Sequence, residues 1–198
     1  MARLRGMDRI AILILAAGAS SRMRGRDKLL EDIEGVRLLS RVVTRAVASG
    51  LPVFVALPGP DHPRAKLIGE AQPVYVADAT EGMGASIRSG VAALARGAGA
   101  VMILPADMPD LTTADMEAMR NAFRAAPDQV HRATAADGTP GHPVVFPARL
   151  FPALMALQGD AGARAVLRDE AVNLVPLPGR HALIDLDTPE DFAEWRAR

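Results

Sequence analysis

The chain has 198 residues, 49% of them hydrophobic, which is enough to bury a substantial core within one domain. Lysine plus arginine and aspartate plus glutamate both number 23, and aromatic residues make up 4%, so neither charge nor base stacking favours a nucleic-acid partner. The absence of cysteine excludes a disulfide framework and a cysteine nucleophile, and it fits a cytoplasmic protein.

Basic residues precede an apolar run at the N-terminus, in the order of a secretory signal. Residues 10–17 nevertheless lead directly into the polar, basic segment 18–22, which is unlike a cleavage region. No stretch approaches the roughly 20 apolar residues of a membrane span. We therefore expect residues 1–8 to be a disordered leader to a single domain, and we expect no membrane partner.

Short apolar runs alternate with helical patterns through the first two thirds of the chain. Strands are predicted at 10–16, 53–57, 74–77 and 101–104, and helices at 38–49, 63–71, 85–96 and 113–125. Such alternation implies right-handed crossovers and a mainly parallel sheet covered on both faces. The predicted fold class is a three-layer α/β/α sandwich with a Rossmann-like sheet.

The pattern changes after Asp128, where a turn at 138–141 precedes the apolar residues 144–146. This change indicates a small β-rich insertion. Further elements are predicted as helices at 148–157 and 161–168, a strand at 172–176 and a closing helix at 188–197.

Ligands of parallel sheets bind beyond the carboxyl ends of the strands, where three polar loops are predicted. The first contains Leu15-Ala16-Ala17-Gly18-Ala19-Ser20-Ser21-Arg22-Met23 and is followed by Lys28. Small residues and free N–H groups can surround an anion, and Arg22 and Lys28 supply charge for a triphosphate. The glycine spacing matches neither the dinucleotide fingerprint nor the Walker loop. An ordinary strand-to-helix turn with solvated basic residues is the alternative.

The other two loops contain a carboxylate and a pair of glycines. Asp107, in Leu104-Pro105-Ala106-Asp107-Met108-Pro109, can bind Mg²⁺ at the end of a strand, or it can cap the next turn. Asp110 or Thr112 is better placed for the capping role. In Glu81-Gly82-Met83-Gly84-Ala85-Ser86-Ile87-Arg88, the glycines permit close approach of a flat ligand and Ser86 can hydrogen-bond, although a helix cap explains this loop equally well.

These loops, together with Gly141-His142-Pro143-Val144, residues 159–164 and residues 185–191, resemble the nucleotidyltransferases of molybdenum cofactor synthesis. These enzymes belong to the MobA-like NTP transferase superfamily, and the resemblance is greatest to the cytidylyltransferase branch. It runs through nearly the whole chain from Ile10. The resemblance implies a fold of the nucleotide-diphospho-sugar transferase type.

The resemblance also implies roles for individual residues. Nucleotide binding falls to Leu15, Ala16, Ala17, Gly18, Ser20, Arg22, Lys28, Gly82, Met83, Ser86 and Asp107. Arg22, Lys28 and Asp107 are the implied catalytic residues. The cofactor Mg²⁺ is assigned to Asp107 and Asp185, with Asp187 as an alternative ligand on the same strand face. His142, Asp160 and Arg164 fall on the acceptor side, where His142 has a binding role, a structural role or, least favoured, a role in proton abstraction.

The implied reaction moves CMP from CTP onto a phosphorylated acceptor, molybdopterin, and releases pyrophosphate. The client molybdoenzyme or its chaperone is then a partner. The alternatives are GTP as donor, a sugar phosphate or phosphorylated organic acid as acceptor, and a non-catalytic cofactor-delivery protein. Gly25 is displaced by one position from the common pattern, so Arg24 and Arg26 are expected to be solvated. Ala17, where the guanylyltransferase branch carries glycine, favours CTP.

Overall fold

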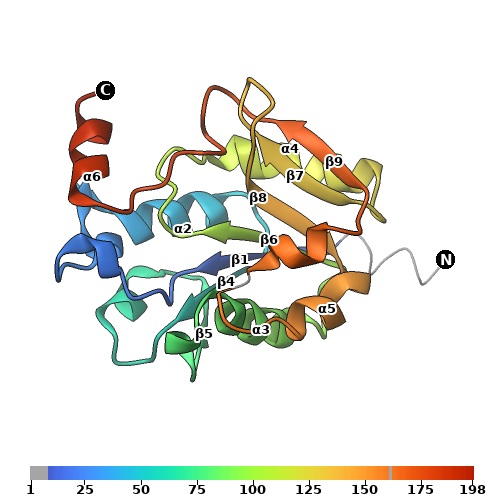
Figure 1. Ribbon diagram of the computed structural model, residues 1–198, viewed down its shortest axis with the longest axis horizontal. Helices are drawn as coiled ribbons and strands as arrows, with labels where there is room; N and C mark the ends of the chain where they lie inside the picture. Colours follow the sequence, from blue (N-terminus) through green and yellow to red (C-terminus); the bar gives the residue numbers. More distant parts are fainter. Residues whose placement is uncertain (1–8, 161) are drawn as a thin grey trace.

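The computed structural model describes residues 9–160 and 162–198, and its centre is a seven-stranded sheet in the order β5-β4-β1-β6-β8-β7-β9 (Figure 1). The expected leader at residues 1–8 lies outside the described residues, as does Ala161. Within the described part of the chain, no helix is long and apolar enough to cross a membrane.

Four neighbouring strands pair in parallel, as predicted. They are β1 (Ile10–Leu15), β4 (Val53–Leu57), β5 (Gln72–Tyr75) and β6 (Ala100–Pro105). In β1, Ile10, Ile12 and Ile14 pack on one side of the sheet, and Ala11 and Leu13 pack on the other. Because both faces of this strand are covered, its sequence is apolar without alternation.

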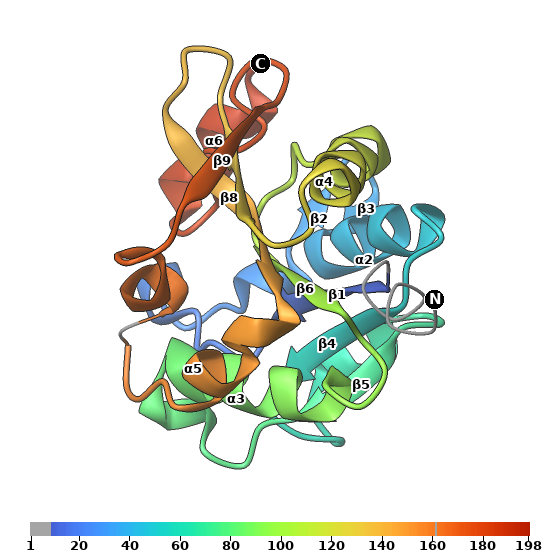
Figure 2. The ribbon, with the colours of Figure 1, turned by 90° about the vertical axis from the view of Figure 1, so that its right-hand side faces the viewer.

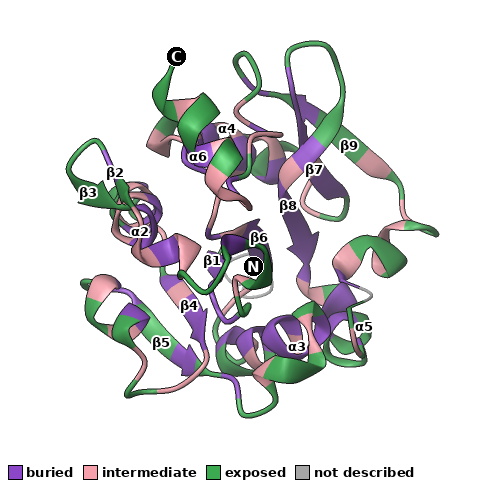
Figure 3. Ribbon diagram, turned by 60° about the vertical axis from the view of Figure 1, so that its left-hand side comes forward, coloured by how far each residue is buried: buried purple, intermediate pink, exposed green. Residues whose placement is uncertain are grey.

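Helices cover both faces of the sheet, which confirms the three-layer architecture (Figure 2). On one face lie α2 (Leu38–Ala48) and α4 (Thr113–Ala125), and on the other lie α3 (Met83–Leu94) and α5 (Phe151–Met155). The central strands are accordingly buried, whereas β9 (Val172–Pro176) at the edge is largely exposed (Figure 3).

The β-rich segment after Asp128 is present and extends the main sheet. Strands β7 (Val130–Thr134) and β8 (Pro140–Pro147) are antiparallel, β8 pairs with β6, and β9 pairs with β7 in parallel. A separate two-stranded sheet joins β2 (Asp32–Ile33) to β3 (Val36–Arg37). The closing helix, α6 (Pro189–Arg196), begins after a capping box made by Thr188 and Asp191.

Three predicted helices were wrong in type or length. The segment 63–71 forms only the 3-10 helix η3 (Pro63–Leu67), before Gly69 takes a positive φ that ordinary helices do not allow. The segment 148–157 divides into η5 (Ala148–Leu150) and α5, since Pro152 can occupy the first turn of a helix but not its interior. The described part of 161–168 contains the 3-10 helix η6 (Ala163–Leu167). The remaining short helices are η1 (Ser21–Met23), η2 (Lys28–Leu30) and η4 (Ala79–Glu81).

Candidate nucleotide site

The loops that follow β1, β5 and β6 meet at one cavity of about 500 Å³. This is the edge where the carboxyl ends of parallel strands converge. Every residue expected to bind the nucleotide lines the cavity: Leu15, Ala16, Ala17, Gly18, Ser20, Arg22, Lys28, Gly82, Met83, Ser86 and Asp107. The structure therefore brings these residues together, and their binding roles remain predictions.

The loop after β1 presents backbone to the cavity. The N–H groups of Ala17, Gly18 and Ala19 donate no hydrogen bond to the described residues. The side chain of Ala17 is 4% exposed and belongs to the core beneath the loop, so its methyl group occupies little of the cavity. Ser20 has a φ of 52°, and its hydroxyl is engaged within the loop, where it accepts a hydrogen bond from the N–H of Lys28 at 3.3 Å.

Three carboxylates gather beside the cavity, and two of them, Asp107 and Asp187, line it. Asp107 follows β6, and oxygens of Asp107, Asp185 and Asp187 all lie within 4.8 Å of one another. The N–H of Leu186 donates to the carbonyl of Asp107 at 3.0 Å, so the two carboxyl-bearing segments are joined through the backbone. The segment 185–187 is not a strand, contrary to expectation, but it still brings both aspartates to Asp107.

Lys28 lies between two of these carboxylates. Its ammonium donates to Asp107 and, at 2.5 Å, to Asp187, and the side chain is 15% exposed. Arg22 pairs with the second oxygen of Asp187 at 2.6 Å. Burial would lower the pKa of Lys28, but the negative charges of Asp107 and Asp187 outweigh it and raise that pKa, so the ammonium stays charged.

The donor set suits a divalent cation. Asp185 makes no ion pair among the described residues, and the loss of hydration together with the charges of Asp107 and Asp187 raises its pKa. One carboxylate oxygen of Asp107 is buried and accepts no hydrogen bond from the described residues. Carboxylate oxygens are the ligands that Mg²⁺ and Mn²⁺ prefer. Asp187, offered only as an alternative from the sequence, is therefore part of the candidate metal site.

His142 is not among the described residues that line the cavity, but it lies close enough to Asp107 for that carboxylate to affect its pKa. Its N–H donates to the carbonyl of Ala182 at 2.9 Å, and a Cβ at Gly141 would collide with that carbonyl, so the preceding position requires glycine. The buried Nδ1 of His142 has no partner among the described residues. Burial, together with the charges of Arg132 and Arg164, lowers the pKa of His142 against the opposing effect of Asp107.

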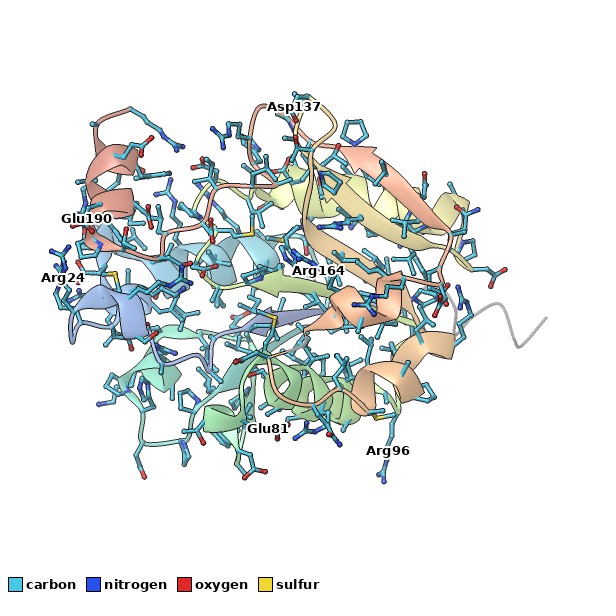
Figure 4. The ribbon with its side chains drawn as sticks, in the orientation of Figure 1. Arg24, Glu81, Arg96, Asp137, Arg164 and Glu190 are labelled. Atoms are coloured by element: carbon cyan, nitrogen blue, oxygen red, sulfur yellow. The ribbon has the colours of Figure 1, made fainter. Side chains whose placement is uncertain are left out.

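The other two residues expected on the acceptor side differ in position. Arg164 is exposed and extends from η6 toward the middle of the molecule in Figure 4. Asp160 lines the same cavity as the loop after β1. Asp160, expected on the acceptor side, therefore adjoins the residues expected to bind the nucleotide.

Gly82 and Gly84, at the start of α3, approach the segment 157–160 rather than open space. A Cβ at Gly84 would come within 2.7 Å of the carbonyl of Gly159, and the N–H of Gly84 donates to that carbonyl at 2.9 Å. Arg88 donates to the carbonyl of Leu157 at 2.6 Å, and Glu81 accepts from the N–H of Gly159 at 3.0 Å. Hydrogen bonds from Arg88 and the Gly159 N–H lower the pKa of Glu81 to about 2. Three hydrogen bonds therefore connect loop 79–88 to loop 157–160.

The basic residues around the displaced glycine are solvated, as expected. Arg24 is 73% exposed and pairs with Glu190 of α6 at 2.5 Å, at the edge of the molecule in Figure 4. Arg26 is 54% exposed and pairs with Glu31 at 3.3 Å. Neither arginine lines the cavity.

Arg64 was not predicted from the sequence, although it contacts the loop after β1. It is 2% exposed and donates to Asp27, Ser20 and two carbonyls of that loop. The signal was available, because Arg64 follows β4, another parallel strand whose carboxyl end lies at this edge of the sheet.

Comparison with known proteins gives relatives along nearly the full chain. The chain is 30% identical over 194 residues to the purine catabolism protein PucB of Bacillus subtilis (strain 168), covering 91% of this chain and 92% of the relative. It is 27% identical over 197 residues to a probable molybdenum cofactor guanylyltransferase of Nostoc sp. (strain PCC 7120), covering 94% and 90%.

Solved structures share the fold. A homologue of Mycobacterium tuberculosis Rv0371c from Mycobacterium sp. strain JC1 superimposes with a TM-score of 0.84 at 22% identity, covering 96% of each chain. Rv0371c of M. tuberculosis H37Rv in complex with manganese gives a TM-score of 0.78 at 22% identity, covering 96% of this chain and 98% of that one. The MobA-like NTP transferase domain matches residues 12–174. The chain therefore belongs to the MobA-like NTP transferase family, a family of nucleotidyltransferases.

Proposed function

We propose that the protein transfers CMP from CTP to the terminal phosphate of molybdopterin and releases pyrophosphate. The observation that carries this proposal is the composition of the cavity. Backbone N–H groups without a partner among the described residues, two basic side chains and the carboxylates of Asp107 and Asp187 line the same space, and Asp185 lies within 4.8 Å of both carboxylates. Such a site can bind a triphosphate and a divalent cation together.

The triphosphate would lie against the loop after β1. The N–H groups of Ala17, Gly18 and Ala19 are available to phosphate oxygens, and Arg22 and Lys28 would neutralise the triphosphate charge. Lys28 is charged and only 15% exposed, so its attraction for a phosphate is screened less by water than that of a surface lysine.

Asp107, Asp185 and Asp187 would hold the divalent cation, which we propose to be Mg²⁺. The buried free oxygen of Asp107 supports this assignment. The manganese complex of the structural neighbour is consistent with a divalent cation in this fold. When bound, the cation supplies positive charge that neutralises the phosphates of the donor.

In the proposed reaction an ionised oxygen of the acceptor phosphate attacks the α-phosphorus of the nucleotide. The new bond joins the acceptor oxygen to the α-phosphorus, the bond to the β-phosphate oxygen breaks, and pyrophosphate leaves with that electron pair. Positioning and charge neutralisation by Arg22 and Lys28 carry most of the catalysis. The acceptor phosphate is already ionised near neutral pH, so no general base is needed.

His142, Asp160 and Arg164 would contact the acceptor. The lowered pKa of His142 makes its ring neutral near pH 7, which suits a hydrogen bond rather than an ion pair with the acceptor. The exposed guanidinium of Arg164 would meet an acidic group of the acceptor. A client molybdoenzyme or its chaperone would then receive the product.

The choice of base and acceptor has specific alternatives. The presence of probable guanylyltransferases among the relatives is an argument for GTP as the donor in this protein. The same nucleotide-binding residues would also serve a reaction with another phosphorylated acceptor. A non-catalytic delivery protein would bind molybdopterin without turnover, but pure binding gives no reason for three convergent carboxylates beside a charged lysine.

The deciding experiment measures pyrophosphate release by the pure protein with CTP, GTP or ATP, with and without molybdopterin. The control acceptor is a sugar phosphate, and a chelator removes the metal. Release with CTP that requires both molybdopterin and Mg²⁺ is the expected result. Faster pyrophosphate release with GTP would identify GTP, not CTP, as the donor. Release only with the sugar phosphate would exclude molybdopterin as the acceptor. Binding without release would favour a delivery protein.

A further inference from the structure

Arg64 is a buried cation that makes five hydrogen bonds behind the loop after β1. Its Nε and Nη2 donate to the two carboxylate oxygens of Asp27 at 2.8 and 2.7 Å. Nη1 donates to the carbonyls of Ala16 at 2.6 Å and Gly18 at 2.8 Å, and Nη2 also donates to the hydroxyl of Ser20 at 3.1 Å. Since a guanidinium has five N–H donors, all of them are used.

Two of these hydrogen bonds determine which way the loop backbone faces. In a planar trans peptide the N–H points opposite to the carbonyl of the preceding residue. Because the carbonyls of Ala16 and Gly18 face Arg64, the N–H groups of Ala17 and Ala19 face away from it. Both residues line the cavity, whereas Arg64 does not. Arg64 therefore directs these donors to the cavity without reaching it.

The bonds to Asp27 and Ser20 control the other end of the loop. Asp27 caps η2 by accepting the N–H of Leu29 at 3.0 Å, and the hydroxyl of Ser20 accepts the N–H of Lys28 at 3.3 Å. The position of Lys28 at the start of η2 is thus tied to Arg64 through two intermediaries. One side chain holds both ends of the loop.

Arg64 itself is held from a different part of the chain. It lies in η3, whose start is fixed by Pro63 and by His62, which accepts the N–H of Arg64 at 3.3 Å. In Figure 1 the segment after β4 lies beside the loop after β1. The conformation of the loop after β1 therefore depends on η3, a segment that does not line the cavity.

We propose that Arg64 is a positioning residue that orients loop N–H groups and Lys28 toward the triphosphate of the nucleotide. This inference rests on the proposed nucleotide site. Lysine cannot replace Arg64, because a lysine has three donors at a single nitrogen and cannot make a bidentate bond to Asp27 together with bonds to two carbonyls.

The test compares Arg64→Lys with Arg149→Lys. Arg149 is a matched control, since it also binds a carboxylate, that of Glu170, and a backbone carbonyl, that of Asp128, but lies outside the cavity. Calorimetric titration with inorganic tripolyphosphate and with CTP gives the affinities. Arg64→Lys should weaken both by about 10- to 100-fold, the scale of a misplacement near 1 Å. Arg149→Lys should leave both within about twofold of the wild type.

Steady-state kinetics separate positioning from general destabilisation. In Arg64→Lys the KM for CTP should rise and kcat should fall, while the KM for the acceptor stays near the wild-type value. A folded Arg64→Lys protein that binds tripolyphosphate like the wild type would overturn the inference, as would equal rises in both KM values.

A second variant decides the question if Arg64→Lys does not fold. Asp27→Asn keeps the shape of the side chain but removes the charge that pairs with Arg64, and it should weaken tripolyphosphate binding by several-fold, about the effect of one charge-assisted hydrogen bond. Unchanged affinity would overturn the inference. If the wild type binds neither tripolyphosphate nor CTP, the proposed nucleotide site fails instead.

Discussion

Removing the Lys28 ammonium tests the centre of the site. Lys28→Ala deletes a charge that is 15% exposed and bonded to two carboxylates, whereas Arg24→Ala deletes one that is 73% exposed and, among the described residues, bonded to Glu190 alone. Both variants lose one positive charge near the same loop, so a difference between their activities reflects the position of the charge rather than the net charge. We expect Lys28→Ala to lower kcat/KM for CTP strongly and Arg24→Ala to lower it only slightly.

The magnitude follows from the two environments. Loss of one well-placed electrostatic donor in a largely water-excluded site lowers kcat by about 100- to 1,000-fold, or about 2.7–4 kcal/mol of transition-state stabilisation. An exposed ion pair such as that of Arg24 contributes about 0–1 kcal/mol, which limits its effect to about fivefold. Lys28→Ala also leaves Asp107 and Asp187 without their shared cation, so a moderate loss of folding stability is expected.

The assay is pyrophosphate release at saturating and limiting CTP, at a temperature where urea titration finds both variants folded. Lys28→Ala should lower kcat/KM for CTP far more than Arg24→Ala does. Equal losses in the two variants would refute the placement of the triphosphate next to Lys28. Equal urea midpoints together with near-normal turnover would refute the role of Lys28 altogether.

Three further predictions concern metal, base and pH. Asp107→Asn should lower turnover by about 100-fold or more with the fold intact, as judged by circular dichroism, and magnesium-dependent activity near that of the wild type would contradict the metal site. A CTP-over-GTP preference of about 10- to 100-fold in kcat/KM is expected. Because Ala17 is only 4% exposed and its methyl group occupies little of the cavity, Ala17→Gly should leave most of that preference in place, and loss of the preference in this variant would identify Ala17 as its cause. Asp27→Asn should lower the free energy of unfolding by about 1–2 kcal/mol at neutral pH, measured by urea titration. Burial would raise the pKa of Asp27, but its buried arginine partner holds that pKa below the ordinary 3.8. The stabilisation is therefore present above pH 3.8, and the urea midpoints of wild type and variant should converge as the pH falls through the lowered pKa. Midpoints that stay apart in acid would exclude the ion pair as the cause.

The sheet and its loops could be predicted because their signals are local. Apolar runs such as β1 are buried on both faces, and parallel strands must place their carboxyl-end loops at one edge. Asp107 was predicted for this reason, and the structure places it beside Lys28. The short 3-10 helices were mistaken for longer helices because Gly69 and Pro152 override the apolar pattern.

Contacts between distant segments could not be predicted. The position of Arg64 after β4 places it at this edge of the sheet, but Arg64 and Asp27 are 37 residues apart, and nothing near either residue indicates that the arginine would be buried under the loop after β1. Similarly, the glycine at position 84 predicts that another group packs closely against the backbone there, but the sequence does not show which group. The structure identifies it as the backbone of Gly159. Such pairings depend on how the loops fold over the sheet edge.

The contact between loop 79–88 and loop 157–160 has a consequence for protein engineering. Gly84 has no room for a side chain because the carbonyl of Gly159 occupies that space, and Glu81 and Arg88 bond to the backbone of the second loop. A chimera that imports only the second loop from a relative would retain these partners only if the imported backbone followed the same path. A graft that carries Asp160, the residue of the second loop proposed to contact the acceptor, should therefore include both loops as one cassette, and single-loop grafts should misfold locally or lose turnover.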